Sequence, residues 1–180
     1  MLLTLPFPIT EYVDQLGTTE SHAAIDLDHL LGQEYEVDLR DGYGARTFIL
    51  VEIDSTGALG IRGRAFKWAD RSAHKVVMGD TDADRIAGVG YISMTKSTVP
   101  DEAYVLLQKR GRCKVIHGSE ATNTLAAARP YATLNGGDAD DGKIMGTATY
   151  AEGSTFARFV SGTAADDAEM VVELLAGCGD

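Results

Sequence analysis

The sequence predicts a mainly β protein, with a single β-barrel or sandwich-like domain, an extended N-terminal arm and one or two short helices. Short segments with strand character follow one another at hairpin spacing, and no helical pattern of about 10–15 residues separates them. Twenty glycines supply the tight turns that such folds need. A length of 180 residues with 44% hydrophobic residues fits one compact core.

The first nine residues are expected to form an extended arm. Pro6 and Pro8 exclude a helix there and favour an edge-strand path. The arm packs either along the edge of its own domain or against a neighbouring subunit. The second alternative follows if its own domain leaves it unburied, because an exposed apolar segment marks an interface. Its apolar residues are therefore candidates for an intersubunit contact: Leu2, Leu3, Leu5, Phe7 and Ile9.

A short helix is expected next, over residues 18–31. Apolar residues recur there at helical spacing, Thr19 can cap the N-terminus, and Gly32 ends the pattern. The arm and this helix make up residues 1–32, and a β-rich domain occupies residues 33–180. A change in composition at residues 97–102 marks a candidate boundary within that domain.

The clearest strand covers residues 34–40, where Tyr35, Val37 and Leu39 alternate with charged residues. A turn at 41–44 leads into a buried strand over 46–53, so the two strands form a hairpin. Residues 103–118 are expected to form two strands that are broken near Gly111. Further strands are expected within 58–68, 73–84, 86–94, 143–150, 154–160 and 169–175, with one helical turn at 121–129.

The chain is acidic, and its formal net charge of −11 restricts its partners. Such a charge repels phosphate backbones and anionic lipid at long range, so neither nucleic acid nor a membrane is expected as a main partner. No apolar run reaches the roughly 18 residues of a membrane helix, and residues 1–10 lack the features of a signal peptide. The protein is expected to be made and kept in cytoplasm, with Cys113 and Cys178 as free thiols.

Two acidic loops resemble binding motifs, but each lacks a necessary part. Residues 137–143 have the spacing of a phosphate-binding loop, yet Ile144 replaces the Ser or Thr that holds Mg²⁺. Residues 80–84 match the first ligand positions of a calcium loop, yet Arg85 replaces its glycine. Solvated charge explains both loops, and a looser Ca²⁺ or Mg²⁺ site in either one stays open as an alternative.

Neither a metal centre nor a catalytic site is predicted. On a helix, His22, Asp26 and His29 would share one face able to hold a transition metal, but the exposed polar side of an amphipathic helix explains them without a metal. The sequence has no Gly-x-Ser-x-Gly elbow, and neither cysteine lies in a motif that would place a base beside it. The protein is therefore interpreted as a non-enzyme with no cofactor, although a dispersed active site would leave no motif.

Basic residues gather in two parts of the sequence. One cluster covers residues 109–114 and includes Arg110 and Arg112, which are chosen as candidate interface residues. On an acidic protein such clusters face carboxylates of a like subunit or of another partner, since charges at the rim of an interface set its register. Exposed strand ends are the alternative explanation. The second cluster contains Arg62, Arg64, Lys67 and Arg71.

The C-terminal part of the chain has a recognisable order of features. A strand with Tyr104, Gln108 and Gly111 precedes a polar, glycine-rich loop to Gly142, and a Gly146-Thr-Ala strand and a Val-rich strand over 170–175 follow. This order resembles the β-rich decoration, or cement, proteins that bind the outside of tailed-bacteriophage heads. The resemblance implies a homo-oligomer, commonly a trimer, seated where major capsid subunits meet. It also implies a place on the capsid surface of the virion, after assembly in the host cytoplasm.

Three classes of function follow from these observations. The first is a structural virion protein that stabilises a phage capsid by bridging its subunits, which fits the glycine-rich turns, the acidity and the apolar arm. The second is a β-barrel module that binds a small ligand or carbohydrate, which would need aromatic residues around a groove; Trp68 and scattered tyrosines are available. The third is a small enzyme with a dispersed site.

Overall fold

The computed structural model confirms a mainly β fold. It describes residues 5–13, 26–54, 62–81, 85–91, 99, 102–118, 124–135, 141–162, 165 and 167–175. Within these ranges eleven strands are joined in one hydrogen-bonded sheet system, with one 3-10 helix, η1 (Asp28–Leu30). The strands are β1 (Tyr12–Val13), β2 (Glu34–Asp38), β3 (Ala45–Ile53), β4 (Ala65–Asp70), β5 (Lys75–Met78), β6 (Ile86–Gly90), β7 (Tyr104–Ile116), β8 (Tyr131–Leu134), β9 (Ile144–Thr147), β10 (Ala157–Gly162) and β11 (Glu169–Leu174).

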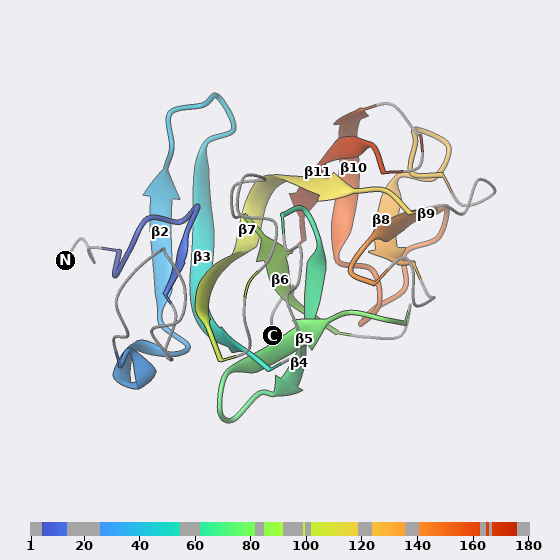
Figure 1. Ribbon diagram of the computed structural model, residues 1–180. Coiled ribbons are helices and arrows are strands. Elements are labelled where there is room, and N and C mark those ends of the chain that lie inside the picture. Colours follow the sequence, from blue (N-terminus) through green and yellow to red (C-terminus); the bar gives the residue numbers. More distant parts are fainter. Residues whose placement is uncertain are drawn as a thin grey trace.

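Five strands form a closed ring in the N-terminal half (Figure 1). The order of pairing is β3, β5, β4, β6, β7 and back to β3, with β3 and β5 parallel and the other pairs antiparallel. Every strand of the ring contributes to one apolar core inside it, for example through Val51, Phe66, Val76, Ala87 and Val105. Closure leaves these strands with few unpaired edges. The strand β2 pairs with β3 outside the ring.

The two faces of β3 and β7 serve different cores, because side chains alternate along a strand. Val51 and Val105 point into the ring, whereas Leu50 and Leu106 belong to a second cluster on its outer side. Tyr35 of β2 covers that outer cluster, and so does the N-terminal arm through Phe7 and Ile9, which are 6% and 7% exposed. The described part of the arm therefore packs on its own domain, where β1 also pairs with β7.

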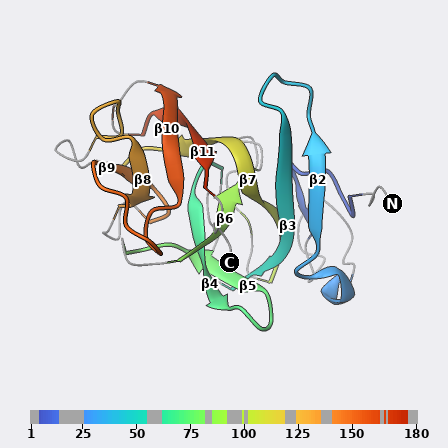
Figure 2. The same ribbon diagram turned by 180° about the vertical axis from the view of Figure 1, so that it is seen from behind.

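A second ring forms from the C-terminal strands, seen from behind in Figure 2. The pairing order is β7, β11, β10, β8 and β9, and an isolated parallel bridge between His117 and Ile144 joins the end of β7 to β9. All five strands again supply one core, for example through Val115, Leu134 and Val172. The molecule therefore consists of two small rings that share β7.

The shared strand differs from the sequence prediction, which divided residues 103–118 into two strands. β7 is one strand of 13 residues, and Gly111 bends it instead of ending it. Gly111 has a φ of 86°, a conformation that glycine adopts without strain. The buried Gln108 side chain holds the bend, since its Nε2 donates to the carbonyls of Arg110 and Arg112 at 3.0 and 2.9 Å. Residues before the bend pair with β3, and residues after it pair with β11.

The other predicted elements are mostly strands of the structure. The hairpin at 34–53 is confirmed as β2 and β3, while the two-residue β1 and the strand β8 were not predicted. Of the predicted helix over 18–31, residues 18–25 lie outside the described residues, and the described end forms only the short η1. The helical turn at 121–129 is wrong where it is described, because Ala126 and Arg129 form a bridge there. The boundary at 97–102 lies largely outside the described residues and stays a prediction.

Within the described ranges, no helix has the length and apolar character needed to cross a membrane.

Candidate functional site

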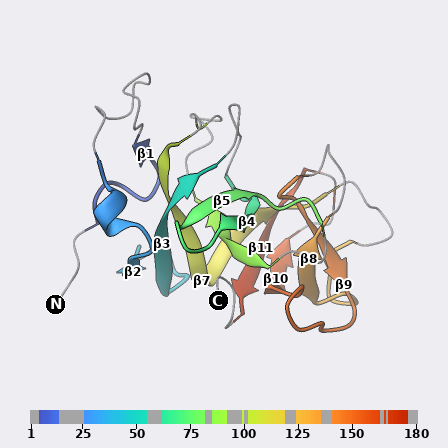
Figure 3. The same cartoon turned by 90° about the horizontal axis from the view of Figure 1, so that it is seen from below.

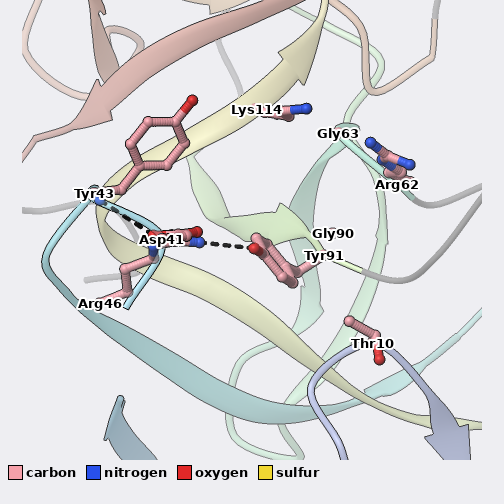
Figure 4. Close-up of a pocket in the computed structure, with 9 residues that line it drawn as sticks. All are labelled: Thr10, Asp41, Tyr43, Arg46, Arg62, Gly63, Gly90, Tyr91 and Lys114. Atoms are coloured by element: carbon pink, nitrogen blue, oxygen red, sulfur yellow. Dashed lines mark hydrogen bonds and ion pairs between the residues drawn. The ribbon is translucent and has the colours of Figure 1, made fainter. Parts of the chain in front are cut away.

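A pocket of about 350 Å³ opens where the β2–β3 turn, the end of β6 and the second half of β7 meet (Figure 4). Its walls combine aromatic rings, glycine backbone and three basic side chains. The close-up shows Tyr43 and Asp41 on the turn, Tyr91 just beyond β6, and Thr10 of the arm at the other side. The lining residues are Thr10, Asp41, Tyr43, Arg46, Arg62, Gly63, Gly90, Tyr91 and Lys114.

Arg46 lines this pocket and is only 1% exposed. Its Nη1 donates to the Tyr91 hydroxyl at 2.8 Å, and its Nη2 forms an ion pair with Asp41. The rings of Tyr43 and Tyr91 lie 5.3 and 5.4 Å from the guanidinium carbon, within the range of cation–π attraction. Burial lowers the pKa of Arg46, but the bonds to Asp41 and Tyr91 outweigh it, so its pKa is raised and the side chain stays charged. No described group accepts a hydrogen bond from its Nε.

Asp41 makes the stability of this network dependent on pH. Its pKa is lowered, first because Arg46 donates a hydrogen bond to the carboxylate and also because the Tyr43 backbone N–H donates to it. A carboxyl with a lowered pKa in the folded state stabilises the fold above its unfolded pKa of about 3.9, and loses that contribution as pH falls through the folded value. Asp41 is 36% exposed, so solvent screening limits the contribution.

We therefore expect Asp41→Asn to lower the free energy of unfolding by about 1 kcal/mol at pH 7, and to have almost no effect near pH 2. Urea unfolding of both proteins at pH 7, 5, 4 and 2 measures the difference. The matched control is Glu152→Gln on an exposed turn. A difference between wild type and Asp41→Asn that stays constant down to pH 2 would show that the carboxylate does not stabilise the fold through its charge.

A strip of basic residues lies beside the pocket, on the outer face of β7, β11 and β10. Cys113 and Val115 point into the second core, so Arg112 and Lys114 point outward. On the neighbouring strands the exposed Arg158 of β10 lies opposite Glu173 of β11. Arg62 reaches the same face from outside these strands. We call these four residues the basic strip: Arg62, Arg112, Lys114 and Arg158.

Two carboxylates pair with residues of the basic strip. Glu169 binds both Arg62 at 2.6 Å and Lys114 at 3.1 Å, and Glu173 binds Arg112 at 3.2 Å. This face has four cations and two carboxylates, so its formal charge is +2. The whole chain carries −11, so all other residues together carry −13. The charge of this face is therefore opposite in sign to the net charge of the molecule.

The same face has an apolar centre. Val160 is 38% exposed and is, with Tyr150, one of the two exposed large hydrophobic residues in the described part of the chain. It lies at an irregularity of β10, between the pairs Phe159–Val172 and Ser161–Val171. The half-buried Val171 points outward beside it, because Met170 and Val172 point into the core. An apolar centre with a charged rim is the usual anatomy of a protein–protein interface.

The candidate interface residues of the sequence analysis are only partly brought together. Arg110 and Arg112 are both exposed, and Arg112 belongs to the basic strip. Leu5 is half-buried, and Phe7 and Ile9 are buried in the outer cluster of their own chain. Leu2 and Leu3 lie outside the described residues. Contacts between subunits stay a prediction for all of them.

Other basic residues from the two sequence clusters have partners within the chain. Lys109 is buried and forms an ion pair with Glu34 at 2.7 Å, and Lys67 forms one with Asp80 at 2.6 Å. Arg64 donates to the backbone carbonyl of Asp141. The sequence analysis did not find the pocket, since Tyr43 was interpreted only as part of a turn. A tyrosine between two turn glycines, two residues after an aspartate, is the signal that could have drawn attention to it.

The motifs with metal or phosphate spacing are only partly described. Lys143 is buried and forms an ion pair with Asp167 at 2.8 Å, and residues 136–140 lie outside the described residues. Residues 82–84 and His22 also lie outside them. Among the residues that are described, no three of His, Cys, Asp and Glu gather where they could hold a metal ion. Cys113 is a buried thiol.

Comparison with known proteins gives a likeness of fold. No family model matches the sequence, and no curated protein matches it. The chain has the fold of a phage capsid chain. That chain belongs to a solved structure titled "The capsid of Myoviridae Phage XM1", with a TM-score of 0.53 and 17% sequence identity. The match covers 87% of this chain and 96% of the other, so nearly the whole of both chains shares the fold. At this level of identity the likeness shows the fold alone.

Proposed function

We propose that this chain is a structural virion protein of a tailed phage. It binds the outer surface of the head as a homo-oligomer, which we take to be a trimer, and it stabilises the capsid by bridging major capsid subunits. The observation that carries the proposal is the fold shared over nearly the full length with a chain of a myovirus capsid. The exposed face with an apolar centre and a charged rim supports a role in assembly.

The stabilising mechanism is thermodynamic linkage. A protein that binds the assembled shell and not its separate subunits shifts the equilibrium towards the shell, by about 2.7 kcal/mol at a concentration one hundred times its Kd. No reaction is needed, since a protein with two exposed surfaces can bridge two neighbouring capsid subunits by binding alone. We therefore assign the protein no catalytic role.

Antibody labelling of intact virions tests the location directly. We expect gold particles over the outer surface of the head when the antibody is raised against the purified chain. Label restricted to the tail, or present only after the heads are broken open, would contradict a decoration role. Heating heads that lack the protein, with and without added purified protein, then tests stabilisation. An unchanged disruption temperature would contradict bridging.

A second candidate function is favoured by the pocket itself. Its volume of about 350 Å³ lies within the range of small-molecule sites, and Tyr43, Tyr91 and the buried Arg46 supply aromatic walls and a charge. A β-rich module that binds a small ligand or carbohydrate would use such a site. Calorimetric titration with neutral and anionic sugars measures it, and saturable binding that Tyr43→Ala abolishes would favour this function over assembly.

A further inference from the structure

The molecule carries a second charged surface, of opposite sign to the basic strip. It consists of five exposed carboxylates on η1, β2 and the segment that precedes η1, which we call the acidic band: Asp26, Asp28, Glu34, Glu36 and Asp38. Arg40 and Lys109 adjoin the band, so its net formal charge is −3. Lys109 forms an ion pair with Glu34 at 2.7 Å.

The acidic band and the basic strip lie on opposite flanks of the molecule. In the sheet, β2 and β10 are separated by β3, β7 and β11. Figures 1 and 3 show the same arrangement from two directions, with β2 and η1 at one side and β10 and β11 away from it. Strands in a sheet are about 4.8 Å apart, so β2 and β10 are on the order of 20 Å apart along the sheet, while Arg112 and Lys114 of β7 lie nearer to β2. In the described part of the chain the ion pairs of the strip are with Glu169 and Glu173, and not with carboxylates of the band.

We propose that the basic strip of one copy of this chain binds the acidic band of a second copy. The inference rests on the self-association contained in the proposed function, and it names the two surfaces that meet. Two copies that each carry −11 repel one another at long range, so a contact between them needs local charges of opposite sign. The strip at +2 and the band at −3 provide them.

The contact also covers apolar surface. Val160 and Val171 lie within the basic strip, so the strip brings an apolar centre to the contact, and the band meets it with the exposed side of β2 that carries Glu36. Because the two surfaces differ, the contact is heterologous: each copy uses its strip towards one neighbour and its band towards another. Such a contact closes into a ring when the rotation between copies allows it.

Charge exchange between the two surfaces tests this inference in solution, with no phage head present. Four full-length proteins are compared by sedimentation velocity from about 1 to 50 µM at low salt: wild type, Arg112→Glu with Lys114→Glu, Glu36→Lys with Asp38→Lys, and all four changes together. We expect wild type to associate, with each pair of changes weakening association by about tenfold or more. The combined protein is expected to associate again. Salt at 0.5 M is expected to weaken the wild-type contact, because it screens exposed charges.

The control has the same change of charge elsewhere. Arg71→Glu with Arg85→Glu alters two exposed arginines outside the strip and is expected to leave association unchanged. If the strip reversal impairs folding, judged by circular dichroism, Arg112→Gln with Lys114→Gln replaces it. A wild type that stays monomeric at 50 µM overturns the inference, and so does a combined protein that fails to associate although both single pairs fold. Antibody labelling of heads tests the decoration role independently. A negative result in sedimentation would therefore overturn the contact between copies without overturning the decoration role.

Discussion

Replacing Arg46 with alanine is expected to lower the free energy of unfolding by about 3 kcal/mol. The side chain is the largest fully buried one in the described part of the chain. Its loss removes the ion pair with Asp41, the hydrogen bond to Tyr91 and the attraction to the rings of Tyr43 and Tyr91. It also leaves a cavity between the β2–β3 turn and the end of β6.

The partial exposure of Asp41 keeps the effect below that of a fully buried pair, because its carboxylate can regain water once the guanidinium is gone. Arg46→Met fills most of the volume, so we expect it to cost about half as much. Urea unfolding at pH 7 measures both variants. The matched control is the exposed Arg71→Ala, expected within about 0.5 kcal/mol of wild type. An Arg46→Ala protein as stable as Arg71→Ala would show that the buried network contributes no net stability.

The hairpin of β2 and β3 was predictable because its signals are local. Tyr35 and Val37 alternate with charged residues, and the turn residues between the strands are glycine and aspartate. β8 was missed since its Tyr-Ala-Thr-Leu segment is short and follows Pro130 without an alternating pattern. β1 has only two residues, and its pairing with β7 comes from a contact distant in sequence.

The bend in β7 shows why a correct local signal can still give the wrong element. Gly111 interrupts the apolar pattern, and a glycine within a strand indicates either a break or a bulge. The choice between them depends on partners distant in the sequence, β3 before the bend and β11 after it. The local pattern contains neither partner.

The candidate site was predictable only in pieces. Both basic clusters were found, but Glu169 joins Arg62 to Lys114 across more than fifty residues of sequence, and only the fold brings these three together. The pocket depends in the same way on Arg46 meeting Tyr91, which is 45 residues away. For the arm, apolar residues interspersed with prolines are compatible with packing on the same domain and with packing on a neighbouring subunit. The structure buries Phe7 and Ile9 against their own domain.

Replacing Gly111 with alanine is expected to lower the free energy of unfolding by about 3 to 4 kcal/mol. Its φ of 86° lies in the left-handed region, which costs an L-residue about 1 to 2 kcal/mol. A Cβ at this position would also lie 2.9 Å from the Ala45 carbonyl oxygen and 3.4 Å from the Cα of Arg46. Both are backbone atoms of β3, so they can move only if the strand pairing that closes the first ring is disturbed.

Gly44→Ala separates the two causes. Gly44 has nearly the same backbone conformation, with a φ of 80°, but nothing lies within 4 Å of the added Cβ. We therefore expect Gly44→Ala to show the backbone cost alone, about 1 to 2 kcal/mol, and Gly111→Ala to exceed it by about 2 kcal/mol in urea unfolding. Because β7 belongs to both rings, the loss at Gly111 should appear as one cooperative transition with a lower midpoint. Equal losses for the two variants, or a separate early transition for one ring, would show that the bend does not couple the rings.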